Sequence, residues 1–127
     1  MTFKTFEDLE VWKLSRELAN DIYSITSKDL FKKDFELKNQ IRSASISILS
    51  NIAEGFERDS TKEFVRFLNI SKGSAGEVRA QLYIALDQKY ISSSEFQNLI
   101  NQVTAISKSL KGFINYLKTK TVKLKNS

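Results

Sequence analysis

The chain has 127 residues, of which 41% are hydrophobic and 28% are charged, a composition typical of one soluble globular domain. Pro is absent and Gly occurs only four times, which favours long helices over many tight turns. Cys and His are both absent. This excludes disulfides, thiolate metal sites, a Cys nucleophile and a His general base.

The ends of the chain carry no sign of export or membrane insertion. Residues 1–6 lack the apolar core of a signal peptide. The longest stretch without a charged residue, 96–107, is far shorter than the roughly 20 residues that span a bilayer. We therefore expect a cytoplasmic protein without a membrane partner.

The net charge of +5 is unevenly distributed. Residues 1–95 hold 14 Lys or Arg and all 15 Asp or Glu, whereas residues 96–127 hold six Lys and no acid. These lysines are Lys108, Lys111, Lys118, Lys120, Lys123 and Lys125. Such a block favours a polyanion such as nucleic acid, but it also suits a solvated helix end, where lysine is favourable.

The first two predicted helices follow from apolar spacing. From about residue 7 to 27, apolar residues recur every three or four positions, after a capping-box-like pair, Thr5 and Asp8. From about residue 35 to 57, two adjacent faces are apolar, one through Ile41, Ile48 and Ile52, the other including Ile46, Leu49 and Ala53. A helix that is apolar on two faces is central or is covered by a partner subunit, so this pattern favours an oligomer.

Two capping boxes introduce the remaining helices. Ser60 and Glu63 predict a third helix from about residue 61 to 88, and Ser92 and Glu95 open a fourth that continues to Lys118. Beyond it the pattern fades, which predicts a basic, disordered tail over residues 119–127. Four long helices with short connections predict an all-α fold: an antiparallel up-down-up-down four-helix bundle over residues 1–118.

The junction of the second and third helices contains unusual small and polar residues. Gly55 is expected to end the second helix in a left-handed conformation. A turn at residues 57–59 places Ala44 opposite Gly73 and Ile41 opposite Gly76, so these two glycines are expected to allow close helix approach, since glycine otherwise weakens a helix.

The same register predicts polar pairs beside the apolar seam. It places Arg42 with Glu77, Asn51 with Arg66, and Glu54 near Glu63 or Lys62. Asn51 and Glu54 are expected to fix the junction or a subunit contact rather than a ligand.

Aromatic side chains are expected to serve the core. Trp12 is assigned to the core or to a subunit interface, and Tyr23, Tyr83 and Tyr116 to its edges. No base-stacking platform is recognisable in the sequence.

Several motifs together resemble one family. In chain order they are Phe6-Glu7-Asp8-Leu9, Val11-Trp12, Gln40-Ile41-Arg42, Ser50-Asn51-Ile52-Ala53-Glu54-Gly55, Lys62-Glu63-Phe64, Arg66-Phe67-Leu68, Gly73-Ser74 and Glu77. Over about residues 5–117 the chain closely resembles the bacterial four-helix-bundle family named after proteins encoded in intervening sequences of 23S ribosomal RNA genes. The resemblance implies an up-and-down bundle that assembles as a homopentamer, in a family without an established activity. The chain is more distantly similar to the accessory protein of diversity-generating retroelements, a pentamer that binds nucleic acid and a reverse transcriptase.

Two functional hypotheses remain open. The first is a non-enzymatic, oligomeric protein that binds RNA or DNA in a largely sequence-independent way, through Arg42, Lys62, Arg66 and the C-terminal lysines. The alternative is a protein-binding scaffold, or an accessory subunit for a nucleic-acid enzyme.

An enzyme is the least favoured class. Glu54 and Glu57 lie three residues apart on one helix, a spacing that can hold Mg²⁺, but only Glu63 is expected nearby on the facing helix. We expect no metal, no cofactor and no catalytic residue.

Overall fold

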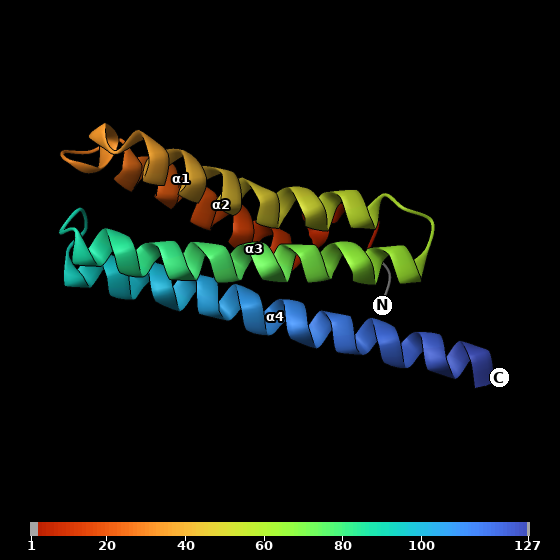
Figure 1. Ribbon diagram of the computed structural model, residues 1–127. Coiled ribbons are helices and arrows are strands. Elements are labelled where there is room, and N and C mark those ends of the chain that lie inside the picture. Colours follow the sequence, from red (N-terminus) through yellow and green to blue (C-terminus); the bar gives the residue numbers. More distant parts are fainter. Residues whose placement is uncertain (1–2, 127) are drawn as a thin grey trace.

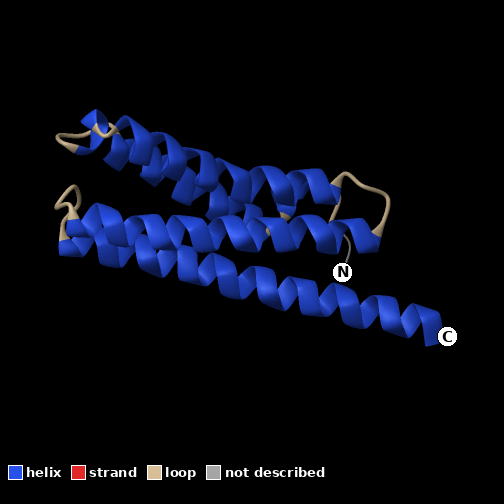
Figure 2. Ribbon diagram, viewed as in Figure 1, coloured by secondary structure: helices blue, strands red, loops and turns tan. Residues whose placement is uncertain are grey.

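The computed structural model describes residues 3–126, with side chains for residues 3–120. Four helices run alternately up and down: α1 (Glu10–Thr26), α2 (Phe35–Phe56), α3 (Thr61–Asp87) and α4 (Ser93–Asn126) (Figure 1). Short 3-10 turns, η1 (Phe6–Asp8) and η2 (Phe31–Lys33), precede α1 and α2. The described residues contain no strand, and loops join the helices only at the two ends of the bundle (Figure 2). The predicted all-α four-helix bundle is confirmed.

One apolar stripe from each helix enters a single core. Its fully buried large side chains include Leu18 and Ile22 of α1, Ile41, Ile48 and Ile52 of α2, Leu68 and Leu82 of α3, and Leu99, Ile106 and Leu110 of α4. Fully burying one such side chain contributes about 1.5–3 kcal/mol, so packing rather than helix propensity supplies most of the stability.

The starts predicted for the third and fourth helices are confirmed, but only the Ser92–Glu95 capping box is complete, because the Glu63 carboxylate accepts from Arg66. The Ser60 hydroxyl accepts from the Glu63 backbone N–H at 3.2 Å. Ser92 and Glu95 satisfy each other's backbone N–H groups, at 3.0 and 2.8 Å. Each box supplies acceptors for amides that lack partners within the first helical turn.

Two hydrogen bonds between hydroxyls of α3 and groups of α2 fix how these helices face each other. The Ser71 hydroxyl donates to the Ile48 carbonyl oxygen at 2.8 Å, and the Ser74 hydroxyl donates to Ser47 Oγ at 2.8 Å. Facing residues of α3 therefore lie two to four positions later than the turn predicts. The predicted register is wrong because these hydrogen bonds between the helices, and not the turn alone, set the alignment.

Gly55 has a different role from the one predicted. It lies inside α2 and is buried, and none of the described glycines has a positive φ. A Cβ atom at this position would lie 2.7 Å from Phe67 Cβ and 3.0 Å from Phe64 Cδ1. The predicted left-handed cap is wrong; glycine is needed here because α3 approaches the α2 backbone closely.

Gly73 and Gly76 do not mediate close approach within this chain. A Cβ atom at either position would meet nothing within 4 Å. The shifted register turns Ser74 and Ala75 of the same segment inward instead, and both are buried. The prediction for these two glycines is therefore wrong for contacts inside one bundle.

The opposite end of the bundle is closed by two loops. Asp29 and Lys89, which follow α1 and α3, have φ of 48° and 63°. The sequence did not predict this left-handed conformation, because neither position holds the glycine or asparagine that usually adopts it. The Tyr90 hydroxyl donates to Asp34 Oδ2 at 3.0 Å, and Asp34 also accepts from the Leu37 N–H at the start of α2. The hydrogen bond from Tyr90 to the Asp34 carboxylate raises the pKa of the Tyr90 hydroxyl.

The fourth helix is longer than expected. Where the sequence predicts a disordered tail from residue 119, the backbone is helical to Asn126. No Gly or Pro occurs between residues 113 and 126, so nothing in the sequence terminates the helix there. None of the described helices is both long enough and apolar enough to cross a membrane.

We expect Gly55→Ala to lower the free energy of unfolding by about 1–3 kcal/mol, because the added methyl group forces α2 and α3 apart. Urea denaturation measures the difference. Gly112→Ala is the matched control, since a Cβ atom there meets nothing within 4 Å, and a gain of up to about 1 kcal/mol is expected. Equal effects of the two substitutions would contradict the close approach at Gly55.

Candidate nucleic-acid interface

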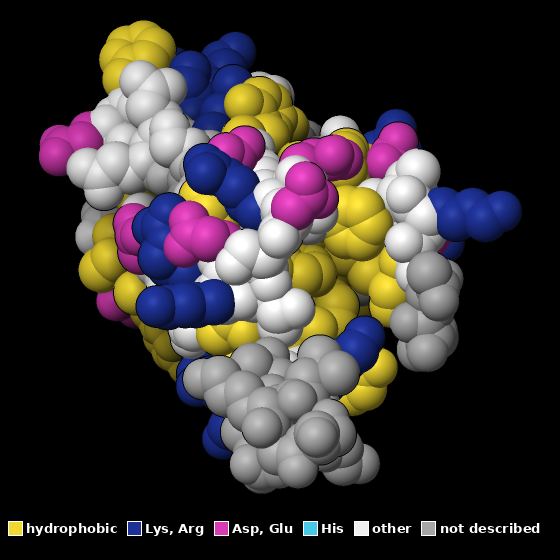
Figure 3. Space-filling model, turned by 90° about the vertical axis from the view of Figure 1, so that its right-hand side faces the viewer, with side chains coloured by type: hydrophobic (Ala, Val, Ile, Leu, Met, Phe, Trp, Pro, Cys, Tyr) yellow, Lys and Arg dark blue, Asp and Glu magenta, His cyan; other side chains and the backbone are white. Residues whose placement is uncertain are grey.

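One end of the bundle gathers the N-terminal segment, the α2–α3 turn and the C-terminal part of α4 (Figure 1). Viewed from this end, hydrophobic side chains remain visible between groups of Lys or Arg and Asp or Glu side chains (Figure 3). Most of the basic residues predicted from the sequence to bind nucleic acid lie near this end or lead to it along α4.

The C-terminal part of α4 forms a lysine overhang, which we define as residues 118–126. Leu117 is the last α4 residue described as buried, and beyond it the helix projects past the start of α3 (Figure 1). At 1.5 Å per residue, the overhang is about 14 Å long. Lys118 and Lys120 are exposed, whereas the side chains of Lys123 and Lys125 lie outside the described residues. Lys108 and Lys111 are exposed on the part of α4 that packs in the bundle.

Arg42 binds the end of α1 rather than Glu77. Its Nε donates to Thr26 Oγ1 at 2.8 Å, and its Nη2 donates to Ser27 Oγ at 3.0 Å and to the Tyr23 carbonyl oxygen at 3.4 Å. The guanidinium also lies over the Tyr23 ring, 4.4 Å from its centroid. A cation at a helix C-terminus is favourable, and these bonds explain why the predicted pair with Glu77 is wrong.

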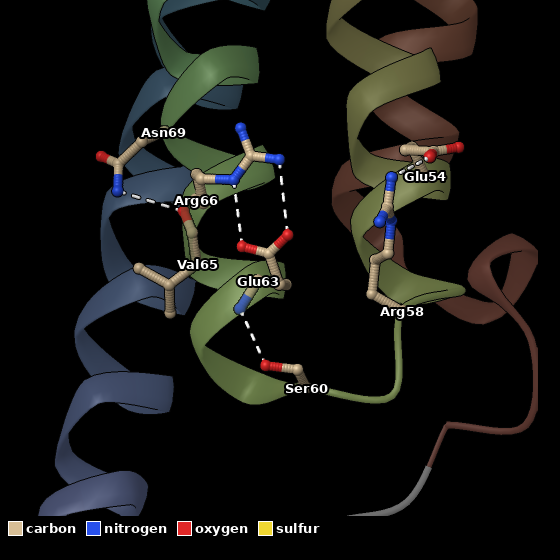
Figure 4. Close-up of polar contacts among 7 residues, drawn as sticks. All are labelled: Glu54, Arg58, Ser60, Glu63, Val65, Arg66 and Asn69. Atoms are coloured by element: carbon tan, nitrogen blue, oxygen red, sulfur yellow. Dashed lines mark hydrogen bonds and ion pairs between the residues drawn. The ribbon is translucent and has the colours of Figure 1, made fainter.

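Arg66 is also bound within its own chain. It forms a two-pronged ion pair with Glu63, at 3.0 and 3.4 Å, one helical turn away (Figure 4). This hydrogen bond is the main cause that lowers the pKa of the Glu63 carboxyl. The predicted pair with Asn51 is wrong, because the Asn51 side chain donates instead to the Ser47 carbonyl oxygen and hydroxyl, at 2.8 and 3.0 Å.

A second ion pair lies on the α2 side of the junction. Glu54 accepts from Arg58 at 2.9 Å rather than meeting Glu63 or Lys62 (Figure 4). The Arg58 and Arg66 guanidinium groups both lie over the Phe67 ring, 5.0 and 4.5 Å from its centroid. Each arginine thus has a carboxylate partner and an aromatic partner inside the chain.

Aromatic rings from three distant segments meet at the same end. Phe113 of α4 contacts Phe3 and Phe64, with ring centroids 6.4 and 5.4 Å apart, and Phe64 also contacts Phe56. Phe113 lies 6.4 Å from Tyr116, whose ring is 47% exposed. The phenylalanines of this cluster are half-buried and Tyr116 is exposed, so the cluster lies at the protein surface.

Trp12 lies beside this end in a half-buried position. Its ring packs against Phe6, 5.1 Å between centroids, and Arg16 lies 5.9 Å above it. Its indole N–H is buried without a hydrogen-bond partner among the described residues. Trp12 packs against the hydrophobic core, which agrees with its assignment to the core; a subunit contact stays a prediction.

Part of the cluster lines an aromatic pocket of about 240 Å³. Its lining residues are Phe3, Leu9, Glu10, Val11, Ser109, Phe113 and Tyr116. Ser109, Phe113 and Tyr116 follow helical spacing on one face of α4, a signal available in the sequence. The sequence gives no signal that Phe3, more than 100 positions away, contributes to the same pocket, so sequence reasoning missed it.

A polar groove of about 450 Å³ runs between α2 and α3. Its lining residues are Asn39, Gln40, Ser43, Ala44, Ser47, Ser74, Glu77 and Gln81. Gln81 Oε1 is buried without a hydrogen-bond partner among the described residues. The described residues contain no cluster of three or more Asp, Glu, His or Cys that could hold a metal ion.

Comparisons with known proteins agree with the architecture. Residues 7–112 match the family model described as 23S rRNA-intervening sequence protein. The crystal structure of a protein of unknown function from the S23 ribosomal protein family of Bacteroides thetaiotaomicron VPI-5482 is similar, with a TM-score of 0.76 and 29% identity. That likeness covers 82% of this chain and 97% of the other. Among curated proteins, none matches this chain.

The contacts of Arg42 predict a structural effect. Arg42→Ala should lower the free energy of unfolding by about 2 kcal/mol, because it removes charged hydrogen bonds to the end of α1. Arg42→Lys should recover only part of this loss, since lysine cannot donate through a planar fork. Arg79→Ala, at an exposed site on α3, is the control and should change stability by less than about 0.5 kcal/mol. Equal denaturation midpoints for Arg42→Ala and Arg79→Ala would refute the role.

Proposed function

The chain belongs to the 23S rRNA-intervening sequence protein family, and we propose that it is a non-enzymatic, oligomeric cytoplasmic protein that binds RNA or other nucleic acid. In this proposal, lysines contact phosphates and binding depends little on sequence. The single observation that carries the proposal is the lysine overhang: an acid-free, helical, basic segment that projects beyond the bundle.

Charge distribution supports this choice of surface. Arg42, Arg58 and Arg66 already have partners in their own chain, so some of the N–H donors of each guanidinium are engaged, and the charges of Arg58 and Arg66 are partly compensated by carboxylates. Residues 96–127 contain no acid, and Lys118 and Lys120 are exposed. Phosphate binding should therefore favour α4, with Lys62 as a further exposed cation near the turn.

The carboxylates offer less support for catalysis. Glu54 and Glu63 each bind an arginine, which leaves neither as an unpaired acid to hold Mg²⁺ with Glu57. This pairing favours a structural role for the acids of the junction.

Replacing the overhang lysines should weaken binding in a salt-dependent way. The test variant changes Lys118, Lys120, Lys123 and Lys125 to Gln. We expect at least about a tenfold loss of affinity for a single-stranded RNA at low salt. The slope of the logarithm of the binding constant against the logarithm of the salt concentration should become shallower by about 0.7 for each phosphate that the variant no longer neutralises. Fluorescence anisotropy across a salt series measures both quantities.

The control for this experiment makes the same change in net charge elsewhere. It replaces the exposed residues Lys13, Lys28, Lys32 and Lys33 with Gln. Its affinity should stay within about twofold of the unaltered protein if contacts at the overhang matter more than net charge. Equal losses in both variants, or RNA binding that does not respond to salt, would refute the proposal.

A second candidate function is protein binding through the polar groove, first of all to other copies of this chain. Four small residues, Ser43, Ala44, Ser47 and Ser74, are among those that line the groove. Elsewhere on α3, Ile70 and Ile84 are 40% and 49% exposed. The buried, unpartnered Gln81 Oε1 would gain a donor from an incoming chain. Five copies are the number that the family resemblance implies.

A bulky side chain in the groove should disrupt this assembly. Ser43 is exposed and lines the groove, so Ser43→Trp fills the groove without entering the core. We expect a smaller mass by multi-angle light scattering, whereas Ala105→Trp, at an exposed site on α4, should leave the mass unchanged. An assembly that tolerates Ser43→Trp would place the interface elsewhere, and a monomeric unaltered protein would refute self-association.

A further inference from the structure

The walls of the aromatic pocket suit a flat ring. Phe113 and Tyr116 are neighbours on α4, with their rings inclined by 35°, and Phe3, which also lines the pocket, meets Phe113 edge-on. Leu9 and Val11 form a buried apolar floor. An unpaired nucleobase stacks on such aromatic faces.

The pocket also contains two polar groups that an aliphatic ligand would leave unused. Glu10 and Ser109 both line it, and Glu10 is exposed. A carboxylate accepts hydrogen bonds from the exocyclic amino group of a base such as cytosine. It repels a phosphate, so a bound nucleotide would place its base, and not its phosphate, near Glu10.

Cations lie where the phosphates of the same strand would run. Lys120 follows Tyr116 by four residues, so it lies one helical turn further along the same face of α4. Lys4 follows the pocket residue Phe3. Both lysines are exposed. The aromatic pocket thus lies next to the start of the lysine overhang, because Tyr116 lines the pocket and Lys120 follows on the same face of α4.

We propose that the aromatic pocket receives one unpaired base of an RNA strand whose phosphates lie along the lysine overhang. This inference rests on the proposed function and specifies its ligand as single-stranded rather than duplex nucleic acid. A base inside a duplex is stacked and paired on both sides, so it cannot enter the pocket without being extruded. The pocket adds a preference for bases that carry an amino group to binding that depends mainly on phosphates.

The test compares short labelled RNAs at low and physiological salt by fluorescence anisotropy. The probes are eight-nucleotide oligo(C) and oligo(U), and a duplex of eight base pairs. Oligo(C) and oligo(U) have the same charge and ring size, but only cytosine presents an amino group to Glu10. We expect oligo(C) to bind more tightly than oligo(U), and both to bind more tightly than the duplex.

Three variants separate the parts of the site. Tyr116→Ser should weaken oligo(C) binding about tenfold while leaving duplex binding within about twofold, because only stacking is removed. Glu10→Gln should reduce the preference for oligo(C) over oligo(U). Lys120→Gln should weaken all three probes in a salt-dependent way.

Matched controls remove the effects of general destabilisation and of charge. Tyr83→Ser changes a tyrosine of similar exposure, 49%, that contacts Phe96 on another part of the surface. Lys28→Gln removes a lysine at the opposite end of the bundle. Neither should change oligo(C) affinity by more than about twofold. Thermal melting verifies that each variant folds.

The outcomes distinguish this inference from the function on which it rests. Salt-dependent binding that is equal for duplex and single strands, and insensitive to Tyr116→Ser, would overturn the pocket but keep phosphate binding. No binding of any probe at low salt would overturn both. Single-strand preference with a tenfold Tyr116→Ser effect would support the assignment.

Discussion

The close contact of α2 with α3 at Gly55 is the constraint on which the rest of the structure depends. With no side chain at this position, the α2 backbone can approach Phe64 and Phe67 of α3. The bonds of Ser71 to Ile48 and of Ser74 to Ser47 then hold the two helices in one register. That register places Phe64 where it can meet Phe113 of α4, so the aromatic cluster follows from the junction.

Competition between internal and external partners determines which cations can bind a polyanion. A guanidinium that already donates to a carboxylate, a hydroxyl or a carbonyl has fewer N–H donors to offer a phosphate, and a neighbouring carboxylate weakens its attraction for the anion. Arg42 and Arg66 fall in this class. For the lysines beyond Leu117, the last buried residue of α4, a phosphate has no acid of the same segment to compete with. In the proposed function, the phosphate-binding surface is therefore narrower than the sequence suggests, and it centres on one helix end.

The sequence predicts the helices well because each depends on local information. Apolar spacing and the Ser60 and Ser92 capping boxes define helix type and starts without knowledge of the partner helix. The register of α2 against α3 depends on contacts between the helices, such as that of Gly55 with Phe67, which local sequence does not reveal. Because the predicted register was wrong, the predicted pairs Arg42–Glu77 and Asn51–Arg66 were wrong as well. The aromatic pocket could not be predicted, since its walls come from both ends of the chain.

The two proposed binding surfaces are compatible because they lie on different parts of the bundle. The polar groove reaches Gln81, near the end of α3, whereas the lysine overhang and the aromatic pocket lie beside the start of α3. An assembly that covers the groove can therefore leave the other end of each copy open to solvent. Several overhangs in one assembly would bind one RNA strand together, and avidity would convert weak phosphate and stacking contacts into stable binding. Self-association would then strengthen nucleic-acid binding without adding a contact to any single copy.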